Sequence, residues 1–563
     1  MLTLRCSIAP EVPGPVLSPP DSKPVRRFKA ASPQGWRPYF FGGDRDGRVR
    51  SVGWNGSGFH DRKRFLVLLD TRQAKGDSKM NFGFIVLWAG YALLLVFLAR
   101  WARGKDHLLP GRVGSAVQAL AYVATYVSAV ALVGFGGLCH RYGLQMLLIA
   151  AGNIWFGTWF VYRFLAWPTR LWQRRLNAKT PGALLGAAIG SRSFRLFAGL
   201  LTGGLLVVYA SAVFKGAAMM LSGVTPLPFS ASLWTLVFLV ALSVTWGGLR
   251  GVLYTEALQG GIMLAGVALL LFAVFRAVGG LPTGLAALSA LPPTELANRG
   301  FMRLSEGPQG LFVLTLAAVT SIGVWAQPQL IQRHFALSSR DEARRAAPVA
   351  MLTIAVVVGG TYLAGGLSRL LITPDEAASP DAVIPLLVSR LLSLPGQQLF
   401  AMAIVSASLS TASALLHIAA GSLGHDLTGR RLEGAAWKTA TAACAIASGL
   451  FAAKSGTIIA LLCTTSWSLI ASAILVPYLA LLAGKADRLA TWASSLGGLA
   501  AASLWYAAGF APTAKGLLGV QVSPAFSGIH PFFVGIAFST GLYLLGLLVS
   551  QWSGEKESVS VAE

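Results

Sequence analysis

A single carboxylate stands inside a long apolar stretch near the middle of the chain. Glu256 lies in the segment WGGLRGVLYTEALQGGIM, residues 246–263, and the apolar run continues to Phe275. It is the only Asp or Glu in the interiors of the membrane helices predicted below. A charge at a helix centre costs about 2.5–3.5 kcal/mol on insertion scales and less near an interface, so such an acid suggests an ion-linked function. Glu256 lies within about two turns of the predicted helix start, so it could instead reach Arg250 or lipid headgroups, and position alone does not decide.

A run of hydroxyl side chains marks another apolar segment, FAMAIVSASLSTASALLHIAAGSLGHDL, residues 400–427. Its hydroxyl residues are Ser406, Ser408, Ser410, Thr411 and Ser413. A hard cation such as sodium prefers oxygen ligands, and hydroxyls with free carbonyls supply them without a buried charge. Hydroxyls in a helix also commonly bond back to their own backbone, and the run by itself leaves both readings open.

Small residues and a proline mark two further segments. Residues 115–144 contain Thr125 and Ser128, followed by closely spaced glycines, which permit close helix packing or an unwound helix that offers carbonyls to a cation. Pro328 removes a backbone donor and should break the helix predicted over 310–332. Lys215 lies within an apolar helix, either as a functional cation or as a side chain that reaches the interface. His417 is expected to be a packed core residue.

The composition indicates an all-α, polytopic membrane protein. Hydrophobic residues make up 54% of the 563, charged residues 12%, and the mean hydropathy is +0.62, whereas soluble domains contain about 25% charged residues. A spanning helix needs about 20 apolar residues. With that window the sequence predicts about 13 transmembrane helices, at 81–101, 115–137, 143–166, 194–221, 229–247, 252–278, 310–332, 347–373, 397–424, 434–453, 456–483, 487–507 and 531–551.

The distribution of the net charge of +24 indicates membrane topology rather than nucleic-acid binding. Basic residues gather in alternate connections: Arg100, Arg103, Lys105 and Arg112; Arg170, Arg174, Arg175, Lys179 and Arg192; Arg333, Arg340, Arg344 and Arg345; Arg430 and Arg431. Cytoplasmic loops carry such an excess, which predicts an N-terminus outside and a C-terminus in the cytoplasm. The four cysteines are too scattered for a disulfide framework or a metal site.

The chain divides into three parts. Residues 1–79 form a basic extension, rich in Pro, Gly and Ser, which we predict to be disordered; residues 80–552 form the transmembrane domain and 553–563 a short polar tail. Translation from Met80 would remove a basic segment that otherwise crosses the membrane against the charge rule, and the alternative is an extension that binds anionic lipid. After the first helix, two blocks of five helices would enter the membrane in opposite senses, as in inverted-repeat transporters. The helix count alone does not establish that architecture.

These segments together resemble the sodium:solute symporter family over about residues 81–551. The most specific piece is GGLRGVLYTEALQ, in which Glu256 stands where the family usually has Asp. Supporting pieces are TYVSAVALVGFGG with RYGL, AQPQLIQRHFA, and SLSTASALL ending in HDL. Within the family the sodium/pantothenate branch is most similar, through TYVSA, RRLNAKT, PDAVIPLLVSRLL, the LSTA run and IHP. The resemblance implies a LeuT-type 5+5 inverted-repeat fold.

The resemblance also implies a sodium site and a substrate site. The sodium ligands would be the carbonyls of Ala124, Val127 and Ala407 and the hydroxyls of Ser410 and Thr411. A second ion site would use Glu256 and Ser413, although Ala414 replaces a second hydroxyl. Substrate contacts would come from Ser128, Trp325 and Gln327. Tyr126 replaces the Asp of proline-transporting relatives, whose aromatic contacts fall on Thr320 and Val324 here, so proline is disfavoured.

The expected function is sodium-coupled import, by alternating access, of a small organic solute, with a carboxylate such as pantothenate or a monocarboxylate as the expected substrate. The alternatives are a proton-coupled or uncoupled carrier of the same fold, or a symporter-like sensor module. No nucleophile–base set is visible, so an enzyme is not expected. We expect no cofactor beyond the coupling sodium ion, no nucleic acid and no obligate protein partner. The expected location is the inner membrane.

Overall fold

A computed structural model describes residues 82–103, 108–109, 111–224, 227–377, 379–430, 432–454, 459–510 and 529–553. The predictions for residues 1–79, for a start at Met80 and for nearly all of the polar tail therefore lie outside the described residues. The chain divides into residues 1–76 and 77–563 by its internal contacts, and the second unit holds every element considered below.

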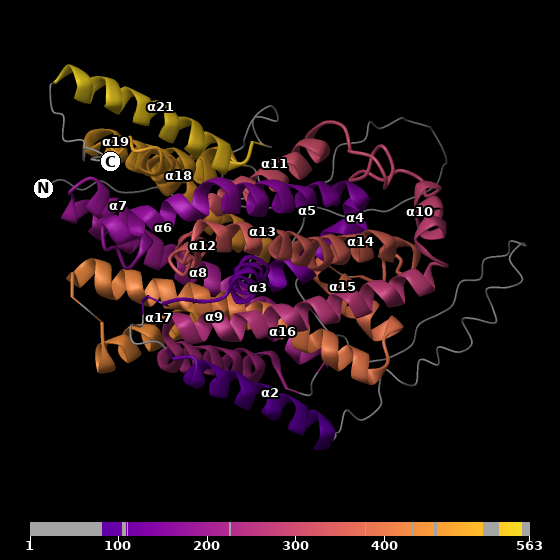
Figure 1. The fold of residues 1–563 in the computed structure, drawn as a ribbon. Helices are drawn as coiled ribbons and strands as arrows, with labels where there is room; N and C mark the ends of the chain where they lie inside the picture. The colour runs from indigo at the N-terminus through magenta and orange to yellow at the C-terminus, as the bar shows by residue number, and fades with distance from the viewer. Residues whose placement is uncertain are drawn as a thin grey trace, which may run out of the picture. The chain divides into compact units, whose positions relative to one another are not determined.

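The described residues form helices and connections without a strand, as the composition predicts (Figure 1). The first half comprises α2 Phe82–Trp101, α3 Ser115–Tyr126, η2 Val130–Phe135, α4 Gly136–Tyr142, η3 Gly143–Met146, α5 Leu147–Ile154, η4 Trp155–Leu165, α6 Ala166–Arg175, α7 Pro181–Ala188, α8 Arg192–Val224 and α9 Phe229–Ala277. The second half comprises α10 Leu281–Ser289, α11 Pro308–Ile322, η5 Gly323–Ala326, α12 Pro328–His334, α13 Arg340–Ile354, η6 Ala355–Gly359, α14 Gly360–Leu367, η7 Ser368–Leu370, α15 Pro380–Leu391, α16 Leu394–Gly421, η8 Ser422–Asp426, α17 Gly434–Lys454, α18 Ile459–Leu482, α19 Arg488–Leu504, η9 Trp505–Gly509 and α21 Pro531–Trp552.

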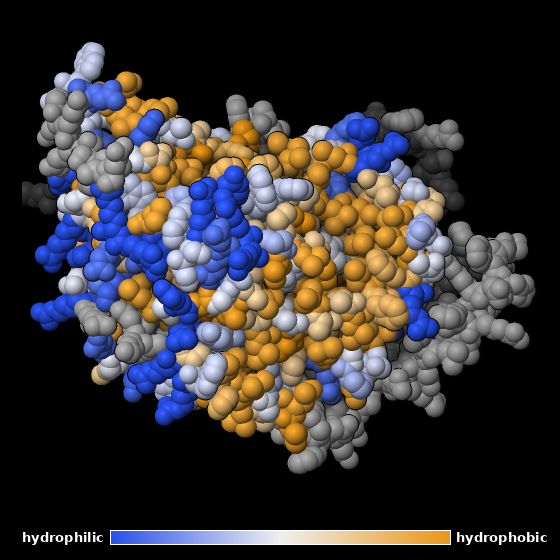
Figure 2. Space-filling view, in the orientation of Figure 1, coloured by the Kyte–Doolittle hydropathy of each residue, from blue (hydrophilic) through white to orange (hydrophobic). Residues whose placement is uncertain are grey.

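Each predicted span overlaps one of these helices, but the count of thirteen stays a prediction. Within the described residues, eight helices are long and apolar enough to cross a membrane. Large apolar side chains point outward from several of them, including Leu93, Phe97, Phe238 and Leu504, each more than 60% exposed. Figure 2 shows such residues as a broad apolar surface with hydrophilic residues gathered toward the ends of the helices. That distribution matches helices surrounded by lipid.

A glycine at a left-handed φ joins the fifth and sixth predicted spans, which run as the single element α9. Gly248 has φ 57° and ψ −173° inside this helix, a conformation that side chains disfavour. One turn later α9 packs closely against α2: a Cβ on Gly251 would lie 2.5 Å from the carbonyl oxygen of Ala99. The glycines of GGLRG thus permit a kink and a close helix contact just before Glu256.

Two transmembrane helices are broken, and each is the first helix of one predicted five-helix block. α3 ends at Tyr126, Val127 is extended with φ −97° and ψ 119°, and the helix resumes after Ser128. In the second block Gln327 is extended and Pro328 begins α12, which confirms the predicted break. Broken helices at corresponding places of two repeats are the feature that forms midplane sites in inverted-repeat transporters.

The glycines beyond the first break serve packing instead. Gly136 and Gly137 are helical, and a Cβ on Gly137 would lie 1.8 Å from the carbonyl oxygen of Pro380. The helix therefore unwinds before the glycines rather than at them. α3 contacts α9, α13 and α16 and lies among these helices (Figure 1).

Candidate functional site

Five oxygen atoms meet where the broken helix α3 faces α16. The Ser410 hydroxyl lies 2.6 Å from the Ala124 carbonyl oxygen and 3.0 Å from that of Ala407. The Thr411 hydroxyl lies 2.9 Å from the Ala407 oxygen and 3.3 Å from the oxygens of Ala124 and Val127. All five residues are at most 2% exposed. The structure thus brings together the whole set that the resemblance implies for sodium.

Local backbone geometry explains why these carbonyls face α16. Regular helix formation stops after Tyr126, so the helix no longer directs every carbonyl toward a donor four residues later. In the structure the two hydroxyls donate to these oxygens. A hydroxyl also has lone pairs that can turn toward a cation, and the cluster then offers three carbonyl and two hydroxyl oxygens with no carboxylate. This donor set suits a hard monovalent ion.

The other hydroxyls of the run have different partners. Ser408 bonds back to the Ile404 carbonyl at 3.0 Å, and Ser406 lies 2.6 Å from the Tyr91 hydroxyl on α2. The run therefore contains hydroxyls that bond to their own helix and hydroxyls that reach another helix, and cation binding stays a prediction. Ser410 and Thr411 bond to their own helix at Ala407 and also across to α3.

Glu256 forms a buried ion pair with Arg333 of α12. One Arg333 terminal nitrogen lies 2.5 Å from Glu256 Oε1, and the two side chains are 1% and 0% exposed. Arg250 instead lies over the ring of Tyr254, 5.9 Å from its centre. The reading in which Glu256 reaches Arg250 or the lipid headgroups is therefore wrong. Arg333 also lies inside the helix bundle rather than in the basic connection to which its sequence position assigned it.

Thr125 connects this ion pair to the oxygen cluster. Arg333 Nε donates to the Thr125 hydroxyl at 3.1 Å, while the Thr125 carbonyl oxygen lies 3.4 Å from the Thr411 hydroxyl. The Arg333 carbonyl in turn accepts from Gln118 of α3 at 2.6 Å. One arginine thus joins α3, α9 and α12 directly beside the proposed sodium ligands.

A small cavity of about 30 Å³ adjoins the cluster, because Val127 lines it. Five aromatic side chains contribute to its lining: Tyr126, Phe135, Tyr209, Tyr362 and Trp467. Its polar side chains are Ser128, Asn153, Thr320 and Thr464. Within the lining that the structure describes there is no charged side chain. Trp467 stacks on Tyr126 with ring centres 6.3 Å apart, and the Tyr126 hydroxyl donates to the Thr320 carbonyl at 2.7 Å, so the two broken helices are bonded across this cavity.

The three proposed substrate contacts lie in different surroundings. Ser128 lines the cavity. Trp325 stacks on Phe160, with ring centres 4.5 Å apart, and its indole donates to the Phe156 carbonyl at 2.9 Å, outside this lining. Gln327 is buried and donates to the Trp467 carbonyl at 3.3 Å, behind the cavity wall. Their role in substrate binding stays a prediction, with Ser128 as the member that the cavity favours.

The structure also gives the surroundings of three further residues that the sequence analysis named. The bonded partner of Glu256 is Arg333 and not Ser413, which is buried on α16, so a second ion site also stays a prediction. Lys215 on α8 interacts electrostatically with Asp381 of α15. His417 is fully buried with its ring against Trp437, as expected for a core residue.

Sequence reasoning missed Arg333 as the partner of Glu256, and it missed most of the aromatic wall. A signal for the ion pair was available, because an acid enclosed in a membrane helix requires a compensating cation. Arg333 lies less than two turns after the break at Gln327. No comparable signal identifies Tyr209, Tyr362 and Trp467, which come from three separate helices.

The fold and the two broken helices define the class as an inverted-repeat membrane transporter of the LeuT type, not an enzyme. A sodium-coupled sialic acid symporter in a substrate-bound outward-open state superposes with a TM-score of 0.63 at 15% identity, over 84% of this chain and 98% of that one. The sequence profile of the sodium:solute symporter family matches residues 108–476, about two thirds of the chain. This protein therefore belongs to the sodium:solute symporter family and is a multi-pass membrane protein.

Two bacterial relatives show how far the similarity extends. The sodium/pantothenate symporter of Escherichia coli is 28% identical over 275 residues, covering 48% of this chain and 55% of that protein. The high-affinity proline transporter of Bacillus subtilis is 26% identical over 343 residues, covering 60% of this chain and 71% of that protein. The first alignment thus spans only about half the length of the pantothenate symporter.

Proposed function

We propose that this protein is a sodium-coupled symporter that imports a small organic carboxylate, such as pantothenate or a monocarboxylate. The observation that carries the proposal is the cluster of five oxygens at the break in α3, with two hydroxyls of α16 as the side-chain donors. A sodium ion held there would join α3 to α16. These elements come from different repeats, so the ion would favour one relative arrangement of the two.

The cavity beside the cluster suits a molecule with an anionic end and an apolar body. The second half of the broken helix begins after Ser128, and Ser128 and Val130 line the cavity. The beginning of a helix carries partial positive charge, and such half-helix ends face anionic substrate groups in transporters of this architecture. The aromatic wall would cover the rest of the molecule. The substrates named for the two bacterial relatives, pantothenate and proline, both carry a carboxylate.

The size of the cavity implies a change of state during transport. Its volume of about 30 Å³ is close to the share of one water molecule in the liquid. A substrate of several carbon atoms therefore requires Tyr126 and Trp467 to separate. Alternating access would provide that movement when the two repeats move against each other.

Coupling follows from differential affinity. Sodium shifts the conformational equilibrium only by the difference in its affinity for the two states, and substrate must raise sodium affinity by the factor by which sodium raises substrate affinity. A membrane potential of 100 mV contributes about 2.3 kcal/mol per charge. Uptake of a monoanion would gain from this potential when more than one sodium ion accompanies it.

The charge distribution supports an orientation. Short connections rich in Lys and Arg remain in the cytoplasm, which would place the N-terminus outside and the C-terminus in the cytoplasm, in the inner membrane of a bacterium.

The test is initial-rate uptake of radiolabelled pantothenate and monocarboxylates into proteoliposomes, with sodium varied against choline. The double variant S410A/T411A should raise the sodium concentration for half-maximal uptake at least tenfold, since loss of about 1.4 kcal/mol is a factor of ten. S408A is the matched control, because that hydroxyl bonds to its own helix at Ile404. Unchanged sodium dependence in a well-folded double variant would refute the site.

A second candidate is a proton-coupled carrier of the same fold. It is favoured by Glu256 Oε2, which is buried and has no hydrogen-bond partner among the described residues. In that case uptake would follow an imposed pH gradient and remain the same when choline replaces sodium. The same proteoliposomes distinguish the two mechanisms.

A further inference from the structure

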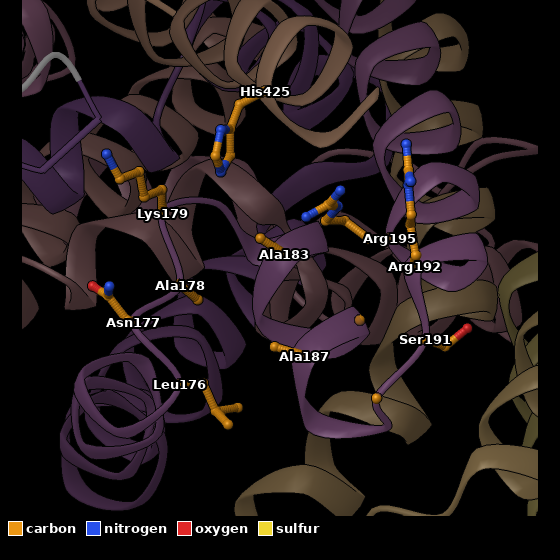
Figure 3. Close-up of a pocket in the computed structure, with 12 residues that line it drawn as sticks. Leu176, Asn177, Ala178, Lys179, Ala183, Ala187, Ser191, Arg192, Arg195 and His425 are labelled. Atoms are coloured by element: carbon orange, nitrogen blue, oxygen red, sulfur yellow. The ribbon is translucent and has the colours of Figure 1, made fainter. Parts of the chain in front are cut away.

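A second cavity, of about 290 Å³, lies away from the oxygen cluster at the ends of α6, α7 and α8. Its charged lining residues are Lys179, Arg192 and Arg195, and His425 of η8 completes the polar wall. Figure 3 shows these four side chains around the hollow, with Lys179 and His425 on one side and the two arginines on the other. None of the described residues that line it is Asp or Glu.

The start of α8 positions the two arginines of the pocket. The Ser191 hydroxyl accepts from the Phe194 amide at 3.1 Å, which sets the start of α8 and puts Arg192 and Arg195 in its first turn. Residues three apart lie on the same side of a helix. α7 packs directly against this turn, since a Cβ on Gly186 would lie 2.7 Å from the Arg195 Cβ. The pocket is therefore formed by α7, the first turn of α8 and η8, together with the short connections on either side of α7.

The charges of this pocket favour an anion. The first turn of a helix carries partial positive charge and favours acidic residues, but α8 has none there and has two arginines instead. The Arg195 Nε is buried and lacks a hydrogen-bond partner among the described residues. Asp426 interacts with Arg195, but it is fully buried behind the pocket and accepts from Thr180 at 2.5 Å. The pocket thus presents Arg192, Arg195 and a helix N-terminus, with one enclosed carboxylate that interacts with Arg195.

We propose that this pocket binds a phosphate group, as the headgroup of an anionic phospholipid or as a free phosphate anion. Arginine presents paired N–H donors that match phosphate oxygens, and exposed amides at a helix N-terminus add to them. The pocket lies on the face that the charge rule assigns to the cytoplasm, where basic pockets between membrane helices bind anionic headgroups. Its volume exceeds that of a single phosphate and accommodates a glycerol phosphate headgroup.

Binding there would connect α8 to the helix that carries the oxygen cluster. η8 continues α16 without interruption, so His425 and Thr411 belong to one helical segment. A phosphate held between the first turn of α8 and His425 would hold these two elements together. The bound group should therefore raise thermal stability, whether or not the protein transports sodium.

The test uses the full chain purified in a neutral detergent. Thermal unfolding is followed while phosphatidylglycerol or phosphatidylcholine is added in mixed micelles, and separately with inorganic phosphate against chloride at equal ionic strength. R192Q and R195Q remove pocket cations. R344Q is the matched control, because it removes an exposed arginine paired with Asp341 on the same basic face, outside the pocket.

We expect phosphatidylglycerol to raise the melting temperature of the wild type and of R344Q. In R192Q and R195Q, the phosphatidylglycerol concentration that gives half of this increase should be at least tenfold higher. Arg192 is exposed, so R192Q keeps the test valid if R195Q fails to fold. Protection by inorganic phosphate as well would identify a site for the phosphate group itself, and protection by phosphatidylglycerol alone a lipid headgroup site. Equal protection of the pocket variants and R344Q, or protection by no anion, would overturn the proposal.

Discussion

Replacing Glu256 with Gln removes the charge that compensates Arg333 in an enclosed pair. The two side chains are 0% and 1% exposed and their closest atoms are 2.5 Å apart. Loss of one partner from a buried pair typically costs about 3–5 kcal/mol, because the remaining charge stays without compensation. E256Q should therefore lower thermal stability strongly. This result differs from the expectation for an acid that only binds an ion, where Gln would leave stability near that of the wild type.

Two further variants separate charge balance from ion binding. In E256Q/R333Q no uncompensated charge remains in the enclosed site, so the double variant should recover part of the loss. E256D keeps the charge and should be less destabilised than E256Q. Melting temperature in detergent and initial uptake rate against sodium concentration are measured for all four proteins. A melting temperature of E256Q equal to that of the wild type would refute the reasoning, and so would a double variant less stable than E256Q.

Two smaller predictions concern contacts outside this pair. Y126F removes the hydroxyl that donates to the Thr320 carbonyl at 2.7 Å. This loss should lower the unfolding free energy by about 1 kcal/mol and slow uptake, and T320S, which keeps that carbonyl, is the control. Unchanged stability and uptake in Y126F would contradict this prediction. A hydrogen bond from Arg390, followed by the Thr373 amide, lowers the pKa of Glu376 to about 2. The stabilising effect of ionised Glu376 is therefore present above pH 4.5 and is lost as the pH falls toward 2. Because the Glu376–Arg390 pair is partly exposed, E376Q should lower the unfolding free energy by no more than about 1 kcal/mol. A difference in melting temperature between E376Q and the wild type that persists at pH 2 would exclude this cause.

The sequence carries much of the site because its chemistry needs particular residue types. Hydroxyls at Ser410 and Thr411 are recognisable as oxygen donors, and Pro328 cannot continue a helix, so both features could be predicted before any coordinates. The first break was harder to place. Val127 and Ser128 have no special backbone requirement, whereas the glycines that follow allow close contacts with other helices, as Gly137 does with Pro380.

Contacts between distant segments explain what the sequence could not provide. Arg333 lies 77 positions from Glu256 in the sequence. It belongs to a group of basic residues that the charge rule alone assigns to a cytoplasmic connection. Its burial depends on α12 entering the bundle after the break at Gln327. The aromatic wall likewise requires α8, α14 and α18 to meet at one cavity, which no spacing within a single helix determines.

The position of Thr125 relates the ion pair to the proposed transport cycle. Its side chain accepts from Arg333 and its carbonyl faces the Thr411 hydroxyl, so any movement of the break in α3 changes both environments together. A cation at the five oxygens would restrain that backbone, and Arg333 restrains it through its hydrogen bonds with Gln118 and Thr125. We infer that Glu256 acts by keeping Arg333 in position, and its direct contact with a second ion stays a prediction. On this reasoning E256D should retain sodium dependence with modest loss, because a carboxylate on either side chain can still orient the arginine.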